Sequence, residues 1–409
     1  MKPVWRRRLR VYPRLIAVAM WGAWGIEVLG HRGWQNVWGH ILWSDFITLY
    51  AAGLLDRLAP HQIYDLEAQA RLQQALIAPT PLPGLNPFIS PPYVAWACRL
   101  LTLLPLPIAL GLWSALTLAL TMHAARRWWH HLPASVRAAL LSFPQFLIVL
   151  FSFFPFLAGW RVGQNHGLTF WLVTQVLMME DKHPTAAALF AGMLLYKPQF
   201  ALGFLILWLA RRQVRALLAF GVVAGTWIGA DIWLHGPARY VAYLEMLPIW
   251  LQLTRDPGFP AFALVTPYSL LTTLLPTALL PLGVALSGPW TAAGATALFA
   301  VVRCGKVHPT GTRILAVLFP LLASPYAQLH DLMIAIPALI LWAAERPSPL
   351  LLPTAIGVYM GSLLLPLLGA AAGLALPALI PLGLLMAMAS AGLLGQPTAP
   401  GPTRPLDNR

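Results

Sequence analysis

Apolar stretches that alternate with short basic segments are the feature that most constrains what this chain can fold into. Segments such as "RRRLRVYPR" near the start, "ARRQVR" at Arg211 and "RCGKVHPTGTR" at Arg303 separate runs long enough, at about 20 residues, to cross a bilayer as helices. Only 10% of the 409 residues are charged and 58% are hydrophobic, whereas soluble domains carry about 25% charged residues. We therefore expect an all-α integral membrane protein.

The net charge of +14 does not by itself indicate a nucleic-acid partner. Lysines and arginines at the ends of apolar stretches are typical of helices oriented with their basic ends in the cytoplasm. We therefore expect cytoplasmic N- and C-termini, surrounding membrane lipids and no nucleic acid. The two cysteines, Cys98 and Cys304, are too few for a disulfide framework and are expected to be free thiols.

A single membrane domain is expected over residues 1–395, followed by a disordered, proline-rich cytoplasmic tail over 396–409. After a first helix that ends near Leu29, an outside loop covers about residues 31–101. Two segments of this loop, "FITLYAAGLLDRL" and "YDLEAQARLQQALIA", have helical periodicity and predict short amphipathic helices along the membrane surface.

The segment from Thr185 to Ala210 is long enough for one crossing, yet the polar segments on both sides of it are expected in the cytoplasm. A hairpin of two short helices that turns at Tyr196-Lys197-Pro198 resolves this conflict. Each arm of about 12 residues reaches about 18 Å, less than the membrane core of about 30 Å. Lys197 would then lie at membrane depth, where a lysine indicates a functional site, although its long side chain could also extend to the headgroups.

Three of the few acids, Asp45, Asp56 and Asp65, fall close together in the predicted outside loop. Asp45 precedes an apolar helical run and could cap it, which does not exclude a chemical role. For Asp65 we favour the helix cap, and for Asp56 a solvent-exposed helix face. Asp231 and Glu27 stand near the ends of apolar stretches and are expected to be exposed at the membrane interface.

Two further polar groups are candidates for substrate contacts. Gln164 and Asn165 in "VGQNHG" fit either a glycine-bounded turn or amides that recognise sugar hydroxyls. His330 and Asp331 stand at a predicted helix start, where a structural role is the more common one. No metal-ligand or nucleotide-binding motif is found, so no metal or cofactor is assigned and metal dependence stays open.

Five segments together resemble glycosyltransferase family 87, a family of membrane enzymes that use polyprenyl-phosphate sugars. They occur in the family's order, from "SDFITLYAAGLL" with its "IYD", through "NPFISPPYVAWACRLLTLLPLP", "GQNHGLTFWLV" and "LLYKPQFALGFLILWLARRQVRA", to "SPYAQLHDLMIAIPAL". The resemblance implies the C-type glycosyltransferase fold, a bundle of about 10–12 transmembrane helices with its catalytic acid in the first outside loop. It also implies a bacterial-type inner membrane, with the active site facing the periplasm.

By this resemblance Asp45 is the general base of an inverting transfer, and His330 assists the proton transfer or binds the phosphate. Lys197 binds the donor phosphate. The donor is a polyprenyl-phosphate sugar, with mannose the commonest sugar in the family, and the acceptor is a hydroxyl of a lipid or glycan. The remaining residues of these motifs expected to contact substrate are Gln164, Asn165, Tyr50, Tyr64 and Asp331.

Two other functions fit the same features. A transporter or flippase of a lipid-linked sugar would also use a lysine at membrane depth, but the polar candidates cluster near one face and no repeated halves are found. A glycan ligase of related fold with a diphosphate donor would be expected to place more arginines outside than this chain does.

Overall fold

The computed structural model describes residues 3–140, 142–254, 259–346 and 348–395. Within these ranges all the regular structure is helical and is joined by loops, so the predicted all-α architecture is confirmed. The predicted tail at 396–409 lies outside the described residues. The cysteines are free, Cys98 buried and Cys304 exposed.

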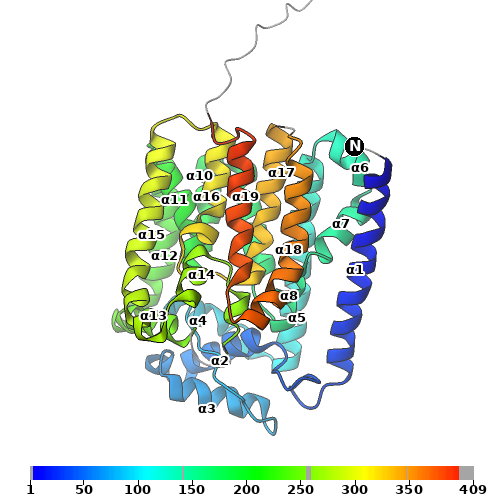
Figure 1. The fold of residues 1–409 in the computed structure, drawn as a ribbon. Coiled ribbons are helices and arrows are strands. Elements are labelled where there is room, and N and C mark those ends of the chain that lie inside the picture. Colours follow the sequence, from blue (N-terminus) through cyan, green and yellow to red (C-terminus); the bar gives the residue numbers. More distant parts are fainter. Residues whose placement is uncertain (1–2, 141, 255–258, 347, 396–409) are drawn as a thin grey trace, which may run out of the picture.

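The long helices stand roughly parallel and form the body of the molecule (Figure 1). Among the described residues, four helices are long and apolar enough to cross a membrane, or five if the bent pair α6 (Ala134–Leu140) and α7 (Phe143–Phe151) is one crossing. These four are α5 (Leu106–His131), α12 (Val214–His235), α15 (Leu280–Arg303, with the turn before it) and α18 (Leu351–Ala372).

Most of the other apolar stretches are divided into shorter helices, so fewer long spans are found than the 10–12 implied by the resemblance. These shorter helices are α6 (Ala134–Leu140), α7 (Phe143–Phe151), α8 (Phe154–Val162), α9 (His166–Met179), α10 (Pro184–Met193), α11 (Pro198–Ala210), α13 (Ala238–Leu253), α14 (Pro267–Leu274), α16 (Pro309–Ala323), α17 (Ala335–Glu345) and α19 (Leu379–Ser390). Helix α1 (Pro3–Leu29) is long and undivided, but it begins with an arginine-rich segment. Breaks of this kind are tolerated at membrane depth only where the backbone is buried in protein or lines a cavity.

Short helices lie across the end of the bundle opposite the N-terminus (Figure 1). They are α2 (Ser44–Leu58), α3 (Leu66–Ile77) and α4 (Pro92–Cys98), and the first two confirm the helices predicted in the loop. Asp65 caps α3 by accepting a hydrogen bond from the Ala68 N–H at 3.0 Å. Asp45 stands in the first turn of α2 and does not cap it, so this carboxylate is available for other contacts.

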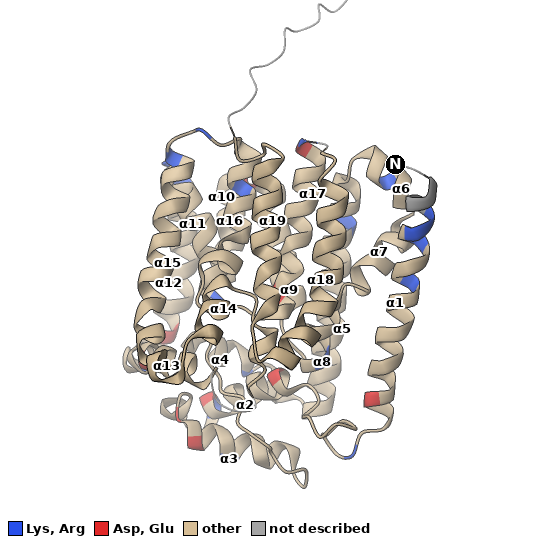
Figure 2. Ribbon diagram, in the orientation of Figure 1, with Lys and Arg blue, Asp and Glu red and all other residues tan. Residues whose placement is uncertain are grey.

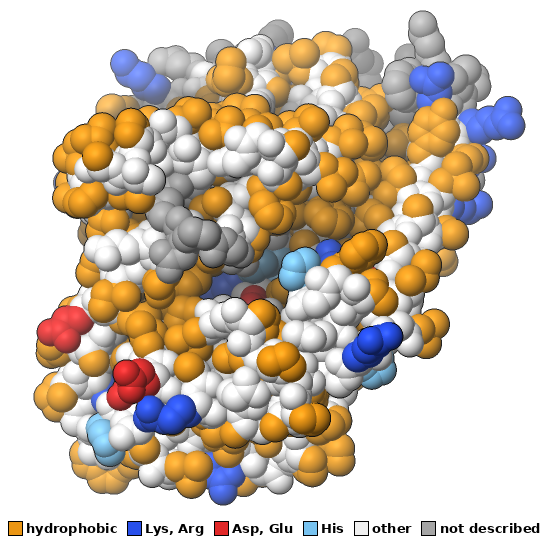
Figure 3. Space-filling model, turned by 60° about the horizontal axis from the view of Figure 1, so that its bottom comes forward, with side chains coloured by type: hydrophobic (Ala, Val, Ile, Leu, Met, Phe, Trp, Pro, Cys, Tyr) orange, Lys and Arg blue, Asp and Glu red, His pale blue; other side chains and the backbone are white. Residues whose placement is uncertain are grey.

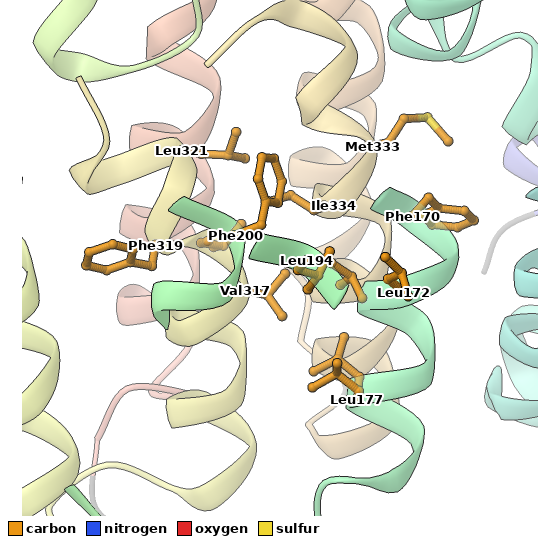
Figure 4. Packing of buried hydrophobic residues seen from close by; sticks show 14 of the residues in the cluster. Phe170, Leu172, Leu177, Leu194, Phe200, Val317, Phe319, Leu321, Met333 and Ile334 are labelled. Atoms are coloured by element: carbon orange, nitrogen blue, oxygen red, sulfur yellow. The ribbon is translucent and has the colours of Figure 1, made fainter. Parts of the chain in front are cut away.

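The predicted hairpin is present. Helix α10 continues into a short 3-10 turn (η3, Leu194–Tyr196), the helical run breaks at Lys197, and α11 leads back. The two arms also meet at the ends that lie away from the Lys197 turn. There Arg211, after α11, forms an ion pair with Glu180, before α10. The break is enclosed by apolar side chains of α9, α16 and the 3-10 helix η6 (Leu329–Ile334), as Figure 4 shows for Leu194 and Phe200.

One glycine allows the second arm to approach its neighbour closely. A Cβ on Gly203 of α11 would overlap the carbonyl of Ala316 in α16. Small residues at helix crossings are typical of membrane bundles, where close van der Waals packing replaces the hydrophobic effect between helices. This contact seats α11, and therefore Lys197 at its start, against the core of the bundle.

The exposure predicted for three acidic residues is wrong. Asp56 is fully buried and forms ion pairs with Arg99 and Arg239, while Asp231, also fully buried, accepts from Arg239 at 2.9 Å. Neither is exposed, because Arg239 of α13 bridges Asp56 of α2 to Asp231 of α12. Glu27 is likewise only 12% exposed and pairs with Arg161 at 2.7 Å.

We expect Asp56→Asn to lower the thermal unfolding midpoint of the detergent-solubilised protein, since removing one partner of a buried ion pair costs about 3–5 kcal/mol. Glu67→Gln is the matched control, because Glu67 pairs with Arg71 on the exposed face of α3. It should leave the midpoint unchanged. Equal midpoints for wild type and Asp56→Asn would show that the buried cluster does not stabilise the fold.

Candidate active site

A cavity of about 780 Å³ lies where the loop helix α2 meets the break in the α10–α11 hairpin. It receives six of the eight predicted site residues: Asp45, Gln164, Asn165, Lys197, His330 and Asp331. Figure 3 shows the hollow from the loop side of the molecule, with basic, acidic and histidine side chains inside it. These residues come from four separate parts of the chain, so only the folded bundle brings them together.

Asp45 is held by one side-chain amide on each carboxylate oxygen. Asn86 Nδ2 donates to Oδ1 at 2.7 Å, and Gln164 Nε2 donates to Oδ2 at 2.7 Å. Burial raises the pKa of the Asp45 carboxyl, while the Asn86 hydrogen bond, the Lys197 charge and the Gln164 hydrogen bond act in the opposite direction. The site therefore contains a carboxylate of increased basicity with a fixed orientation.

A glycine allows the Gln164 loop to reach Asp45. Gly163 has φ of +69°, in the left-handed region, and a Cβ there would lie 2.7 Å from the Phe46 Cβ on α2. Gln164 Oε1 also accepts from the Asn165 N–H at 2.9 Å, so both the nitrogen and the oxygen of this side-chain amide form hydrogen bonds. Asn165 is buried, and its Oδ1 has no hydrogen-bond partner among the described residues.

Lys197 provides the positive charge of the cavity. Its Nζ donates to Asp331 Oδ1 at 2.9 Å and lies 3.3 Å from His330 Nε2. Asp331 is fixed in turn because its other oxygen accepts from the Gln328 N–H at 2.9 Å. Asp331, predicted to contact substrate, is thus the counterion of Lys197, and the lysine is 14% exposed.

Tyr50 and Tyr64 are not among the residues that line the cavity. The Tyr50 hydroxyl donates to the Leu104 carbonyl at 2.8 Å, on the other side of α2. The Tyr64 hydroxyl donates to the Ser90 carbonyl at 2.6 Å, and its ring stacks on Phe88. Both tyrosines therefore stabilise the position of the loop through hydrogen bonds to backbone carbonyls.

Asn86 is the contact of Asp45 that the sequence did not reveal. It stands in "PTPLPGLNPF", where an asparagine before proline is typical of a turn. No periodicity marks it, because the segment has no regular structure. The sequence did place Asn86 at the start of the family-like segment "NPFISPPY", but that resemblance gave the residue no role.

The cavity also has an apolar limb, which continues from the polar end along α15. The limb is lined by small side chains of one face of α15 opposite larger ones: Ser287, Gly288, Thr291, Ala292, Ala295, Leu202, Leu205 and Phe220. The helical rise from Ser287 to Ala295, eight residue steps, is about 12 Å. A single site thus offers charged groups at one end and an apolar wall beside the long helices.

Among the described residues, no three His, Cys, Asp or Glu side chains are grouped as metal ligands, and we assign no ion to the site. Searches among curated proteins and among solved structures found no match to this chain.

The family model of glycosyltransferase family 87 matches residues 88–325. The match covers more than half of the chain and includes the Gln164 loop and the Lys197 hairpin, though not Asp45. Together with the all-helical membrane architecture, it shows that this chain is a membrane glycosyltransferase and belongs to glycosyltransferase family 87.

Proposed function

We propose that the protein transfers a sugar, a hexose such as mannose, from a polyprenyl-phosphate donor to a hydroxyl of a lipid or glycan acceptor. The observation that carries this proposal is one cavity that combines a carboxylate, a lysine and an apolar limb. A polyprenyl-phosphate sugar has matching parts, namely a sugar, an anionic phosphate and a hydrocarbon chain. The limb along α15 would receive the first isoprene units.

Asp45 acts as the general base in this proposal. It accepts the proton of the acceptor hydroxyl while the acceptor oxygen attacks the anomeric carbon of the donor sugar. The bond from that carbon to the phosphate oxygen breaks, and its electron pair leaves with the polyprenyl phosphate. One displacement inverts the anomeric centre, and general base catalysis of this kind contributes about 10²–10⁴ in rate.

Lys197 neutralises the leaving phosphate, which gains one negative charge as the bond breaks. An ammonium is a compact charge suited to a phosphate oxygen, and electrostatic stabilisation of developing charge is often the largest catalytic effect. His330 Nε2 lies 3.3 Å from Lys197 Nζ, and in this proposal it binds the same phosphate. Gln164 and Asn165, on the Asp45 side, would face the sugar.

The distribution of charge supports an outward-facing site. Lysines and arginines gather at the end of the bundle that carries the N-terminus (Figure 2), whereas the hollow is seen when the opposite end is turned forward (Figure 3). By the positive-inside rule the basic end faces the cytoplasm. In a bacterial-type inner membrane the cavity would then face the periplasm.

Asp45→Asn should abolish transfer of radiolabelled mannose from polyprenyl-phosphate mannose to a total membrane-lipid extract, assayed with purified protein in detergent. The amide keeps the size of the side chain but cannot accept the proton, so we expect a loss of at least about 10² in rate. Asp65→Asn, which changes a capping acid of the same loop, should remain active.

Full activity of Asp45→Asn would reject Asp45 as the base. If wild type transferred no label from any of several polyprenyl-phosphate sugars, the transport alternative would gain support instead, since a flippase forms no new glycosidic bond.

Lys197→Met should lower kcat/KM by about 10²–10³, because the departing phosphate loses its positive partner. The double variant Lys197→Met/Asp331→Asn removes the unpaired carboxylate that the single change leaves behind. It should recover thermal stability without recovering activity. Recovery of wild-type activity in the double variant would show that Lys197 serves only to pair with Asp331.

The pH dependence of kcat/KM should show an acid limb that belongs to Asp45. The base works only when ionised, and burial raises the pKa of Asp45. Activity should therefore fall with decreasing pH at a midpoint above the ordinary aspartate value of about 3.9. A flat profile from pH 4 to pH 8 would contradict an ionised Asp45 as the base.

A further inference from the structure

We infer that Asn86 is the positioning residue of the base, and that α3 holds it in place through Gln73. This inference rests on the proposed function, because it concerns how Asp45 is aligned for proton transfer. Asn86 lies before Pro87, in the irregular segment between α3 and α4. It lines the cavity together with Asp45.

The contact between Asn86 and Asp45 is specific in its geometry. Asn86 Nδ2 donates to Oδ1 at 2.7 Å, while Gln164 Nε2 donates to the other oxygen at 2.7 Å. The Ser44 hydroxyl donates weakly to Oδ1 as well, at 3.5 Å. An ionised carboxylate offers about four lone-pair sites on its two oxygens. The two amides fix the plane of the carboxylate, and Oδ2 keeps a lone pair for the acceptor proton.

Asn86 is itself held by two side chains through its backbone carbonyl. Thr48 Oγ1 on α2 donates to this oxygen at 2.8 Å, and Gln73 Nε2 on α3 donates to it at 2.8 Å. Gln73 is only 2% exposed and Thr48 only 6%, so both hydrogen bonds are shielded from water. An irregular segment thereby acquires a fixed position beside the base.

A second glutamine of α3 strengthens this interpretation. Gln69 Oε1 accepts from the Phe88 N–H at 2.7 Å, two residues after Asn86. Gln69 and Gln73 are one helical turn apart, so both lie on the face of α3 that meets the segment. The amphipathic helix predicted to lie on the membrane surface thus serves as a support for the active site.

Losing the Asn86 amide removes a donor that stabilises the ionised form of Asp45. We expect the acid limb of the kcat/KM profile of Asn86→Ala to move to higher pH by about one unit, the effect of losing one hydrogen bond to a charged group. Asn86→Ala should also lower kcat/KM by about tenfold above that limb, because the carboxylate is less well aligned.

Gln73→Leu should move the acid limb in the same direction by a smaller amount. The matched control is Gln74→Leu on the same helix. Gln74 makes two hydrogen bonds to the segment, to the Thr80 carbonyl at 2.9 Å and from the Leu82 N–H at 2.7 Å, but none to Asn86. It should leave the acid limb where it is in wild type, even if stability decreases.

The profiles are measured with the full-length protein in detergent, with polyprenyl-phosphate mannose as donor, alongside Asp45→Asn. An inactive Asp45→Asn with a shifted limb in Asn86→Ala supports the inference. An inactive Asp45→Asn with an unshifted limb in Asn86→Ala overturns it and leaves the proposed function standing. An active Asp45→Asn overturns both.

Discussion

The ion pair between Lys197 and Asp331 is the interaction on which the rest of the site depends. It joins two places where helical structure is interrupted, the turn of the α10–α11 hairpin and the 3-10 helix η6. A buried cation without a partner would be strongly unfavourable, and so would irregular backbone facing lipid. Because the two breaks lie together inside the bundle, each provides the polar surroundings that the other requires.

The break in the hairpin brings Lys197 to the cavity beside this ion pair. A continuous helix through residue 197 would place its lysine along a regular helix face and would pair its backbone internally. The break instead leaves Lys197 between α11 and η6, with His330 at 3.3 Å. The charge therefore stands at the end of an apolar limb, where a phosphate attached to a hydrocarbon chain would meet it.

The loop side of the site is built on a different principle. Asp45, the proposed base, stands on α2, outside the long helices, and its carboxylate accepts hydrogen bonds from an irregular segment and from the Gln164 loop. The buried cluster of Asp56, Arg99, Arg239 and Asp231 anchors α2 to α12 and α13. Salt bridges and side-chain amides thus hold the loop in place, whereas apolar packing holds the helices of the bundle together.

The sequence predicted the parts that depend on length, hydropathy and local pattern. The hairpin at Lys197 was predicted because its stretch is too short for two crossings. Asp45 was selected as a candidate site residue because acids are rare in this chain and it stands in a family-like segment. The pairing of Asp56 with Arg239 could not be predicted, because the two residues are 183 positions apart and nothing local marks their contact. Asn86 was missed because its contact with Asp45 joins two distant parts of the chain, and because its own segment has no periodicity.

In the proposed function the cavity binds the donor phosphate beside Lys197, with the sugar toward Asp45. The decisive measurement is an experimental structure of the protein with bound polyprenyl phosphate. We expect phosphate density in contact with Lys197 Nζ and His330 Nε2, and hydrocarbon density along Ser287, Thr291 and Ala295 of α15. A phosphate bound elsewhere, with this cavity empty, would show that the cavity is not the donor site.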